Sequence, residues 1–337
     1  MSNEGQTPDL SGDRGFRTVR ESTYKYALAG CAALSVLTTL SIIGVLVLDA
    51  ADFFTVIPIS EFLTGTRFSP NLEPVAFGVL PLILGTLLIT IGAAVIALPV
   101  GLLTAIYLSE YASGRTRAVL KPMLEVLAGV PTVVYGYFGL VYITPALNVV
   151  IDALNGTLGT QFPQLGLFNG ISASIVVGIM IIPMVSSISE DAMSSVPDAL
   201  RQAGYGLGAT KFNVSVRVVV PAAVSGIASS FILAISRAIG ETMAVVLAAG
   251  SQPPDIPPVQ TAFGVLPYMA PGDLLGLYAE SSATMTVAMI NIAVSDLSGG
   301  SLAYQSLFAI GLTLFVITLG LNVLALFIVR RYREQYE

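Results

Sequence analysis

An arginine and a glutamate stand four residues apart in a stretch otherwise free of charge: Arg237 and Glu241 are the only charged residues between positions 218 and 254. On a helix this spacing places both side chains on one face, where they can pair. An unpaired charge at mid-bilayer costs at least about 2.5–3.5 kcal/mol, and such residues usually face a cavity. One hypothesis is a neutralised pair that fixes the helix against its neighbours. The other hypothesis places Arg237 on an anion path, because guanidinium presents a planar set of N–H donors that suits oxyanions. Glu241 would then hold the guanidinium of Arg237 in position.

The rest of the chain offers little for covalent chemistry. It has no histidine, which removes the usual general base and most triads and metal sites. The single cysteine, Cys31, excludes an internal disulfide and Cys-x-x-Cys chemistry. No G-x-x-x-x-G-K-[ST] phosphate loop occurs, so any ATP hydrolysis belongs to another subunit. A formal net charge of −6 argues against a nucleic-acid partner. We expect no catalytic residue, no metal ligand and no cofactor held by this chain.

The composition predicts an all-α membrane protein. Only 11 % of the 337 residues are charged, against about 25 % in soluble proteins, and 54 % are hydrophobic. A spanning helix needs about 20 apolar residues. The gaps between charges predict six transmembrane helices, near 26–48, 76–108, 123–145, 171–190, 222–250 and 303–329. The segment 281–295 is too short and too polar to span, and we expect a partly buried helix or a re-entrant piece there.

Lysines and arginines predict the orientation in the cell membrane. With both termini in the cytoplasm, 13 of the 15 positive charges lie inside and only Arg67 lies outside. The outer loops then carry nine acidic residues, which suits delivery of an anion by a docked protein better than capture from solution. Residues 1–25 are expected to form a cytoplasmic tail, disordered over the first 23, and residues 331–337 a second tail. The first span, 26–48, precedes a core over 74–330.

The most informative polar segment is the 190–221 loop, on the predicted inner side. Asp198 can cap a short helix that begins at Ala199. Gly206 and Gly208 end this helix, and Thr210 can cap a second one that stops at Pro221. An ordinary solvated loop is the simpler interpretation, and a compact knob that meets a partner is the alternative.

The spacing in this loop resembles the signature of ABC importer permeases: Glu-Ala-Ala, three residues, Gly, nine residues, then Ile-x-Leu-Pro. The departures are a glutamine in place of the glutamate and a glycine in place of the second alanine. In that family the loop is the coupling helix, which inserts into a groove on an ATPase subunit. The matching positions are Gln202, Ala203, Gly204, Gly208, Val218, Val220 and Pro221.

Further stretches, at 85–112, 124–140 and 236–250, look like the phosphate-importer permeases. The stretches 236–250 and 305–331 resemble the PstC-type subunit more than its PstA-type sister. The resemblance implies an ABC importer type I (MetI-like) fold and a non-catalytic permease subunit that moves inorganic phosphate. It also implies a homologous PstA-like permease, two copies of a PstB-like ATPase that binds ATP and Mg²⁺, and an extracytoplasmic PstS-like phosphate-binding protein. Three alternatives remain: a permease for sulfate, molybdate or tungstate, a stand-alone secondary transporter or channel, and a membrane scaffold or sensor.

Other polar and small residues receive structural interpretations. Glu190 and Asp191 are adjacent, and a solvated membrane boundary explains them, as it explains Glu110 and Glu125. Three prolines fall inside the second, third and fourth predicted spans, where each frees a backbone carbonyl. Three glycines of the second span are expected to serve close helix contact. These residues are Pro99, Pro131 and Pro183, and Gly85, Gly92 and Gly101.

Overall fold

The computed structural model describes residues 14–256, 260–262, 266–268 and 271–333, and helices dominate this part of the chain. Two short antiparallel hairpins pair β1 (Phe68–Ser69) with β2 (Ala76–Phe77) and β3 (Gln260–Ala262) with β4 (Leu266–Tyr268). The helices are α1 (Arg14–Val56), α2 (Ile59–Thr64), α3 (Leu80–Ile106), α4 (Gly114–Ala128), α5 (Thr132–Phe138), α6 (Thr144–Leu158), α7 (Gly170–Ser194), α8 (Asp198–Gly206), α9 (Lys211–Val214), α10 (Val220–Ala222), α11 (Val224–Ile239), α12 (Met243–Ala248), α13 (Pro271–Ala279), α14 (Met285–Val294) and α15 (Leu302–Arg333), with π-helical turns at Tyr107–Tyr111, Gly139–Ile143 and Ser215–Val219.

In the described residues, five helices are long and apolar enough to cross a membrane. A sixth span is obtained when two helices joined at a 71° bend, Lys211–Ala222 and Val224–Ile239, are counted as one. This agrees with six predicted spans. The five helices cover Val19–Val56, Leu80–Tyr111, Thr132–Leu158, Gly170–Ser194 and Leu302–Phe327.

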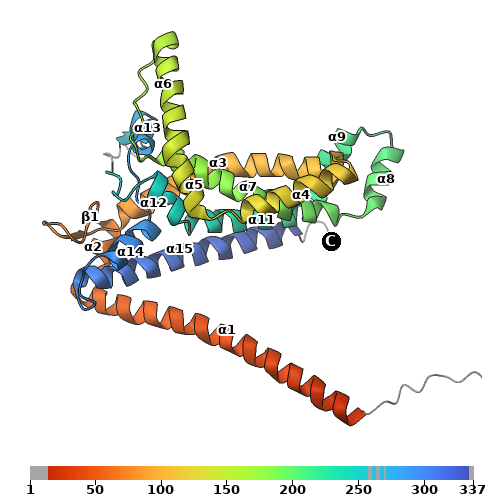
Figure 1. Ribbon diagram of the computed structural model, residues 1–337, viewed down its shortest axis with the longest axis horizontal. Helices are drawn as coiled ribbons and strands as arrows, with labels where there is room; N and C mark the ends of the chain where they lie inside the picture. The colour runs from red at the N-terminus through yellow and green to blue at the C-terminus, as the bar shows by residue number, and fades with distance from the viewer. Residues whose placement is uncertain (1–13, 257–259, 263–265, 269–270, 334–337) are drawn as a thin grey trace, which may run out of the picture.

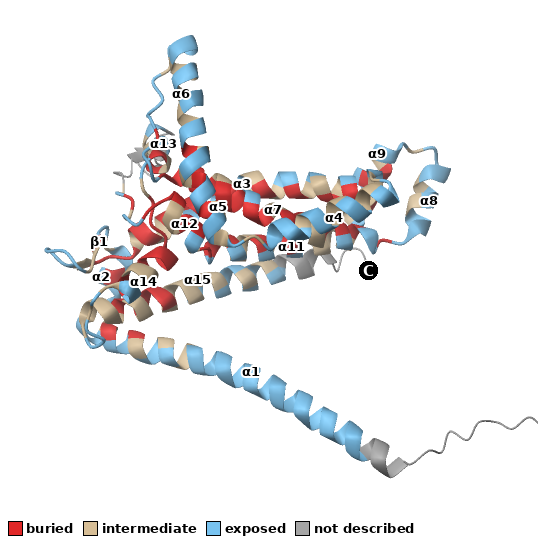
Figure 2. Cartoon of the chain, in the orientation of Figure 1, coloured by how far each residue is buried: buried red, intermediate tan, exposed pale blue. Residues whose placement is uncertain are grey.

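The core lies where α3 and α7 pack along their lengths, as the buried residues in Figure 2 show. Gly101 allows this approach, since a Cβ there would lie 2.6 Å from the Cβ of Val185 on α7. A side chain at Gly92 would meet Ser174 of α7, and one at Gly85 would meet the backbone of Ala283. The prediction of close helix contact is confirmed for Gly92 and Gly101, whereas Gly85 packs against the segment between α13 and α14. Interiors packed this closely leave little room for an added methyl group.

Three parts of the chain extend away from this core (Figure 1). Helix α1 meets α15 near one end and then diverges, and most of its length is exposed. Helix α6 rises from the bundle beyond α5, and α8 and α9 project from the opposite end of the bundle to α14. In a bilayer, exposed apolar surface of this kind faces lipid or another subunit.

The third span differs from its prediction. The interval 123–145 was expected to be one helix, but the chain breaks at residues 129–131, between α4 and α5. Pro131 precedes the first residue of α5 with ψ near 134°, so it starts this helix instead of lying inside a span. Proline also disfavours helical geometry in the residue before it, Val130, so α4, which ends at Ala128, does not continue into α5. Pro99 and Pro183 lie inside α3 and α7 as expected.

The fifth span also differs, because 222–250 was expected to be continuous. The chain bends after Ala222, runs as α11 to Ile239, breaks at residues 240–242 and resumes as α12. Gly240 follows the last residue of α11, where glycine carries no side chain to support continued helix. The expectation of a partly buried helix within 281–295 is confirmed by α14.

The ends of the chain correct one expectation. Residues 14–23 were expected to be disordered, but α1 begins at Arg14. At the other end, α15 continues to Arg333, into the predicted 331–337 tail. Residues 1–13 and 334–337 lie outside the described part of the chain.

Candidate functional site

The expected pair of Arg237 and Glu241 does not form. Arg237 lies in the last turn of α11, and Glu241 lies beyond the end of that helix. Because the helix stops at Ile239, the four-residue spacing no longer places the two side chains on one face. Within residues 14–256, 260–262, 266–268 and 271–333, Arg237 is exposed and makes no ion pair or side-chain hydrogen bond.

Glu241 has a local structural contact instead. Its Oε1 accepts a hydrogen bond of 3.2 Å from the backbone N–H of Ala244, in the first turn of α12. Its backbone carbonyl accepts from the Thr286 hydroxyl on α14 at 2.9 Å. The residue is buried. Glu241 therefore caps α12 and ties the break to α14, and it does not orient the guanidinium of Arg237.

The 190–221 loop contains the two short helices that the sequence predicts. Gly208 has φ of +79°, a conformation that favours glycine, and turns the chain between α8 and α9. Thr210 caps α9 by accepting from Asn213 N–H. Two details are corrected: α8 begins at Asp198 itself, with no side-chain cap, and the helical segment passes through Pro221 and bends only after Ala222.

The seven motif positions differ in how far their side chains are buried. Gln202 and Ala203 are exposed on α8, whereas a Cβ on Gly204 would lie 2.9 Å from a methyl group of Val214. Glycine at this position thus lets α8 approach α9. Val218 and Val220 pack against an apolar cluster, and Pro221 is the middle residue of α10. The cluster consists of Ala105, Met193, Val196, Val214, Val219, Ala223 and Ile227.

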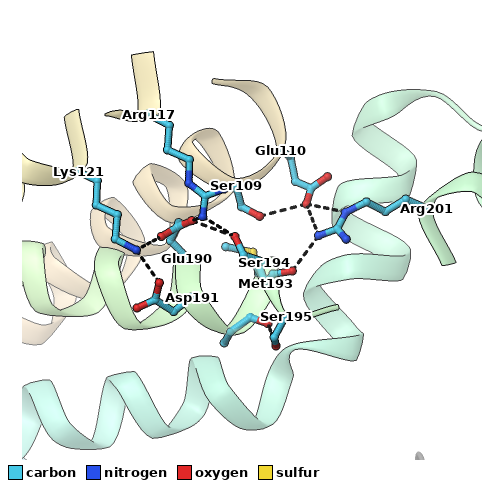
Figure 3. A network of polar contacts seen from close by, with 11 residues as sticks. Ser109, Glu110, Arg117, Lys121, Glu190, Asp191, Met193, Ser194, Ser195 and Arg201 are labelled. Carbon is cyan, nitrogen blue, oxygen red and sulfur yellow. Dashed lines mark hydrogen bonds and ion pairs between the residues drawn. The ribbon is translucent and has the colours of Figure 1, made fainter. Parts of the chain in front are cut away.

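A network of charged side chains, absent from the sequence-based predictions, joins α4 to the end of α7 (Figure 3). Glu190 has a side-chain exposure of 0 % and accepts from Arg117 and from Lys121 Nζ, the latter at 2.7 Å. Lys121 also donates to Asp191 at 2.5 Å, and Ser194 donates to Glu190 at 2.9 Å. The hydrogen bonds to Asp191 and then Glu190 raise the pKa of Lys121 above its usual 10.5. The solvated boundary expected here is wrong for Glu190 and holds for Asp191, which is 62 % exposed.

A second group in Figure 3 joins the 190–221 loop to the end of α3. Arg201 on α8 donates to Glu110 Oε1 from Nε (3.2 Å) and Nη2 (3.0 Å). It also donates to the carbonyls of Met193 (2.8 Å) and Val196 (2.5 Å) and to Asp198 (3.1 Å). The Glu110 side chain is only 4 % exposed, so a solvated boundary is wrong for this residue too. Glu125 is exposed, as expected.

The sequence contains only weak indications of these contacts. Arg117 and Lys121 stand four apart on one helix face, and Glu190 follows a long apolar stretch. Their pairing joins residues about 70 positions apart in the chain, a proximity that appears only once α4 is folded against α7.

The fold defines a class of protein: a multi-pass membrane protein with a projecting two-helix loop. The chain matches the family model of the "Binding-protein-dependent transport system inner membrane component" over residues 97–334, and it belongs to this family. It is therefore an ABC importer permease subunit of the inner membrane, of the kind that pairs with an ATPase and a binding protein.

Relatives of known sequence extend the match to most of the chain. The "Probable ABC transporter permease protein YqgH" of Bacillus subtilis (strain 168) is 32 % identical over 312 residues, which cover 92 % of this chain and 91 % of the relative. The "Phosphate transport system permease protein PstC" of Mesorhizobium japonicum is 32 % identical over 279 residues, with 80 % and 78 % covered. PstC of Haemophilus influenzae is 31 % identical over 283 residues, with 81 % and 82 % covered.

Solved structures agree on the fold. A chain of a bacterial ABC transporter that imports the acidic polysaccharide alginate superposes with a TM-score of 0.60 at 15 % identity, covering 95 % of this chain and 99 % of that one. A second alginate transporter structure gives 0.58 at 14 % identity, with 95 % and 98 % covered. At these identities the likeness supports the type I importer fold alone.

Proposed function

We propose that this chain is the PstC-type permease subunit of an ATP-driven phosphate importer and forms half of the translocation pathway. The PstC relatives from several bacteria support phosphate as the substrate. The other parts of the complex are then a PstA-like permease, two PstB-like ATPase subunits that hold ATP and Mg²⁺, and a PstS-like phosphate-binding protein.

The main observation behind the proposal is the environment of the Arg237 side chain. Its guanidinium is exposed and has no partner among the described residues, and it lies beside a break in an apolar span. An arginine within a membrane usually faces a water-filled cavity or another subunit. Guanidinium stays protonated at all physiological pH values, and its unused donors match the oxygens of phosphate. Arg237 thus acts as an anion contact on the pathway, shared with the partner permease.

The 190–221 loop suits docking on an ATPase. Its exposed surface carries large apolar side chains, and Leu207 at the tip of the loop is 90 % exposed. Apolar residues in a polar setting mark contact surfaces between proteins. The other members of this exposed set are Leu200, Tyr205, Phe212 and Val216. The loop and both termini then lie in the cytoplasm, in line with the distribution of lysine and arginine.

The test replaces Arg237 by glutamine in the complete complex, reconstituted with the ATPase, the sister permease and the binding protein. Arg237→Gln should abolish uptake of labelled phosphate, because the side chain loses its charge and its donor fork. Assembly and ATP hydrolysis should persist, since Arg237 holds nothing in place among the described residues. Arg115→Gln is the matched control: it removes an exposed arginine on α4 and should leave uptake unchanged. Uptake near the wild-type rate in Arg237→Gln would refute the role of this residue.

Two competing functions have separate readouts. A permease for another oxyanion predicts that sulfate, molybdate or tungstate competes better than unlabelled phosphate. A stand-alone secondary transporter or channel predicts transport by the purified chain without the ATPase. We expect neither outcome. The PstC relatives favour phosphate over the other oxyanions, and the family membership assigns the chain to a transport complex.

A further inference from the structure

We infer that the contact between Arg201 on α8 and Glu110 at the end of α3 transmits movement of α8 to the transmembrane core. The two are positioning residues for transport: they touch no substrate, and they hold α8 and α3 in a fixed relation. The inference rests on the proposed function only in so far as α8 receives the movement of an ATPase.

Arg201 is placed to join three elements. Its Nε and Nη2 both donate to one oxygen of Glu110, at 3.2 and 3.0 Å, and Ser109 donates to the same oxygen at 3.1 Å. Its remaining N–H groups reach the carbonyls of Met193 and Val196, at and just beyond the end of α7, and the exposed carboxylate of Asp198. The Arg201 side chain is only 14 % exposed. A charge-assisted bond to a carboxylate is roughly twice as strong as a neutral one, so the link is both shielded and directional.

Helix α8 has few other attachments to the membrane spans. None of its residues is buried. In the described residues, every side-chain hydrogen bond from α8 to the ends of α3 and α7 comes from Arg201. Its main backbone packing is against α9 and the Ser215–Val219 turn. A displacement of α8 therefore reaches α3 directly through Glu110.

The receiving end of this contact is a π-helical turn. Residues Tyr107–Tyr111 close with a hydrogen bond from Ala112 N–H to the Tyr107 carbonyl, at 2.8 Å. Such turns carry one extra residue and often occur at functional sites. The second helix of the loop touches the same turn, since Lys211 Nζ on α9 lies 5.1 Å from the centre of the Tyr111 ring. Both short helices thus hold the turn that ends α3.

An apolar route exists beside this polar one, and the experiment must separate them. Val214 and Val219 belong to a buried cluster with Ala105 of α3 and Met193 of α7. That cluster attaches the second half of the loop and is untouched by a change at Glu110. Loss of the polar link should therefore leave the loop folded and the complex assembled, while α8 moves without α3.

The test measures phosphate uptake per ATP hydrolysed in the reconstituted complex. Coupling free energies between sites typically correspond to factors of about 5–150. Glu110→Gln keeps an acceptor but loses the charge, and uptake per ATP should fall about fivefold. Glu110→Ala removes the acceptor, and the ratio should fall about tenfold or more. Glu125→Gln and Glu125→Ala are matched controls at an exposed carboxylate and should keep the wild-type ratio. Co-purification of the ATPase checks assembly, and if the alanine variant does not assemble, the glutamine variant decides.

A distance measurement tests the link without any substrate, so it stays informative if phosphate is not transported. Spin labels are attached at Ala199→Cys on α8 and Leu103→Cys on α3, both exposed positions, in a Cys31→Ser background. The wild-type pair should keep one narrow distance distribution with and without bound ATP. In the Glu110 variants the distribution should broaden or shift when ATP binds. Unchanged uptake per ATP, or a distribution as narrow as that of the wild type, would overturn the inference. Absence of phosphate uptake by the unmodified complex would instead contradict the proposed function alone.

Discussion

Two groups of charged residues in this molecule differ in how completely their hydrogen-bonding capacity is used. At the break of the fifth span, the exposed Arg237 has no partner among the described residues. At the end of the bundle that carries α8 and α9, Glu190 and Glu110 each accept from several donors and are almost inaccessible. N–H donors that make no hydrogen bond within the protein can bind an oxyanion, whereas donors already bonded to a carboxylate hold helices in a fixed relation. The first region is therefore suited to a transient ligand and the second to force transmission.

The largest effect on stability is expected at Glu190. Glu190→Gln leaves Arg117 and Lys121 facing a neutral side chain in a shielded position. Breaking a buried pair costs about 3–5 kcal/mol, and the partly exposed cations reduce this to about 2–3 kcal/mol in the free energy of unfolding. The purified complex should show a clearly lower thermal midpoint. Arg237→Gln is the comparison, because this charge has no partner in the described part of the chain and its loss should leave the midpoint within error.

We call the region around Glu190 and Glu110 saturated, because its carboxylates accept from several donors, and the region around Arg237 unsaturated. If Glu190→Gln and Arg237→Gln lowered the thermal midpoint equally, this contrast between the two regions would be wrong. Figure 3 shows why we expect them to differ: two cations and a serine converge on the one carboxylate.

A smaller effect is expected at Glu241, where the pairing hypothesis and the capping contact make opposite predictions. Glu241→Gln keeps an oxygen for the N–H of Ala244, so uptake should stay within about twofold of the wild type, or about 0.4 kcal/mol. Glu241→Ala removes the cap and should lower stability by about 1 kcal/mol. Phosphate uptake and the thermal midpoint are measured on the same preparations. A loss of uptake in Glu241→Gln as deep as in Arg237→Gln would restore the ion pair as a functional unit.

The sequence predicted those parts of the fold that depend on local composition. Charge-free intervals located the first, second, fourth and sixth spans, because burying a charge in lipid is costly wherever the chain folds. The third and fifth spans are shifted or broken relative to the predicted intervals 123–145 and 222–250. The turn between α8 and α9 followed from Gly208, since its left-handed φ excludes most other residues. The glycines at the contact of α3 and α7 followed from the need for close approach.

Features that depend on continuity or on long-range contact were missed. Placing Arg237 and Glu241 on one face assumed an unbroken helix, but Gly240 ends α11 between them. Glu110 and Glu190 were assigned to solvent because the sequence does not show which cation lies opposite. Their partners, Arg201 and Arg117, are 91 and 73 positions away. A carboxylate at a membrane boundary is thus not sufficient evidence of exposure.

The smallest effect is expected at Asp191, on the solvent side of the saturated region. Asp191→Asn removes the contact that contributes most to the raised pKa of Lys121. Because Asp191 is largely exposed, the loss in stability at neutral pH should be about 0.2–1 kcal/mol. A double-mutant cycle with Lys121→Met isolates the contribution of the pair.

The pH dependence of this coupling follows from the direction of the shift. Folding raises the pKa of Lys121, so the stabilisation is fully present below its unfolded pKa of about 10.4 and is lost as the pH rises through the higher folded value. The coupling energy from the cycle should be constant between pH 7 and 9 and fall toward zero above about pH 10.5. Measuring the free energy of unfolding of the cycle variants across this pH range checks the prediction. A coupling that instead kept its full value at pH 11.5 would mean that Asp191 acts through packing and not through the lysine charge, and the charge pairing of Lys121 would then rest on Glu190 alone.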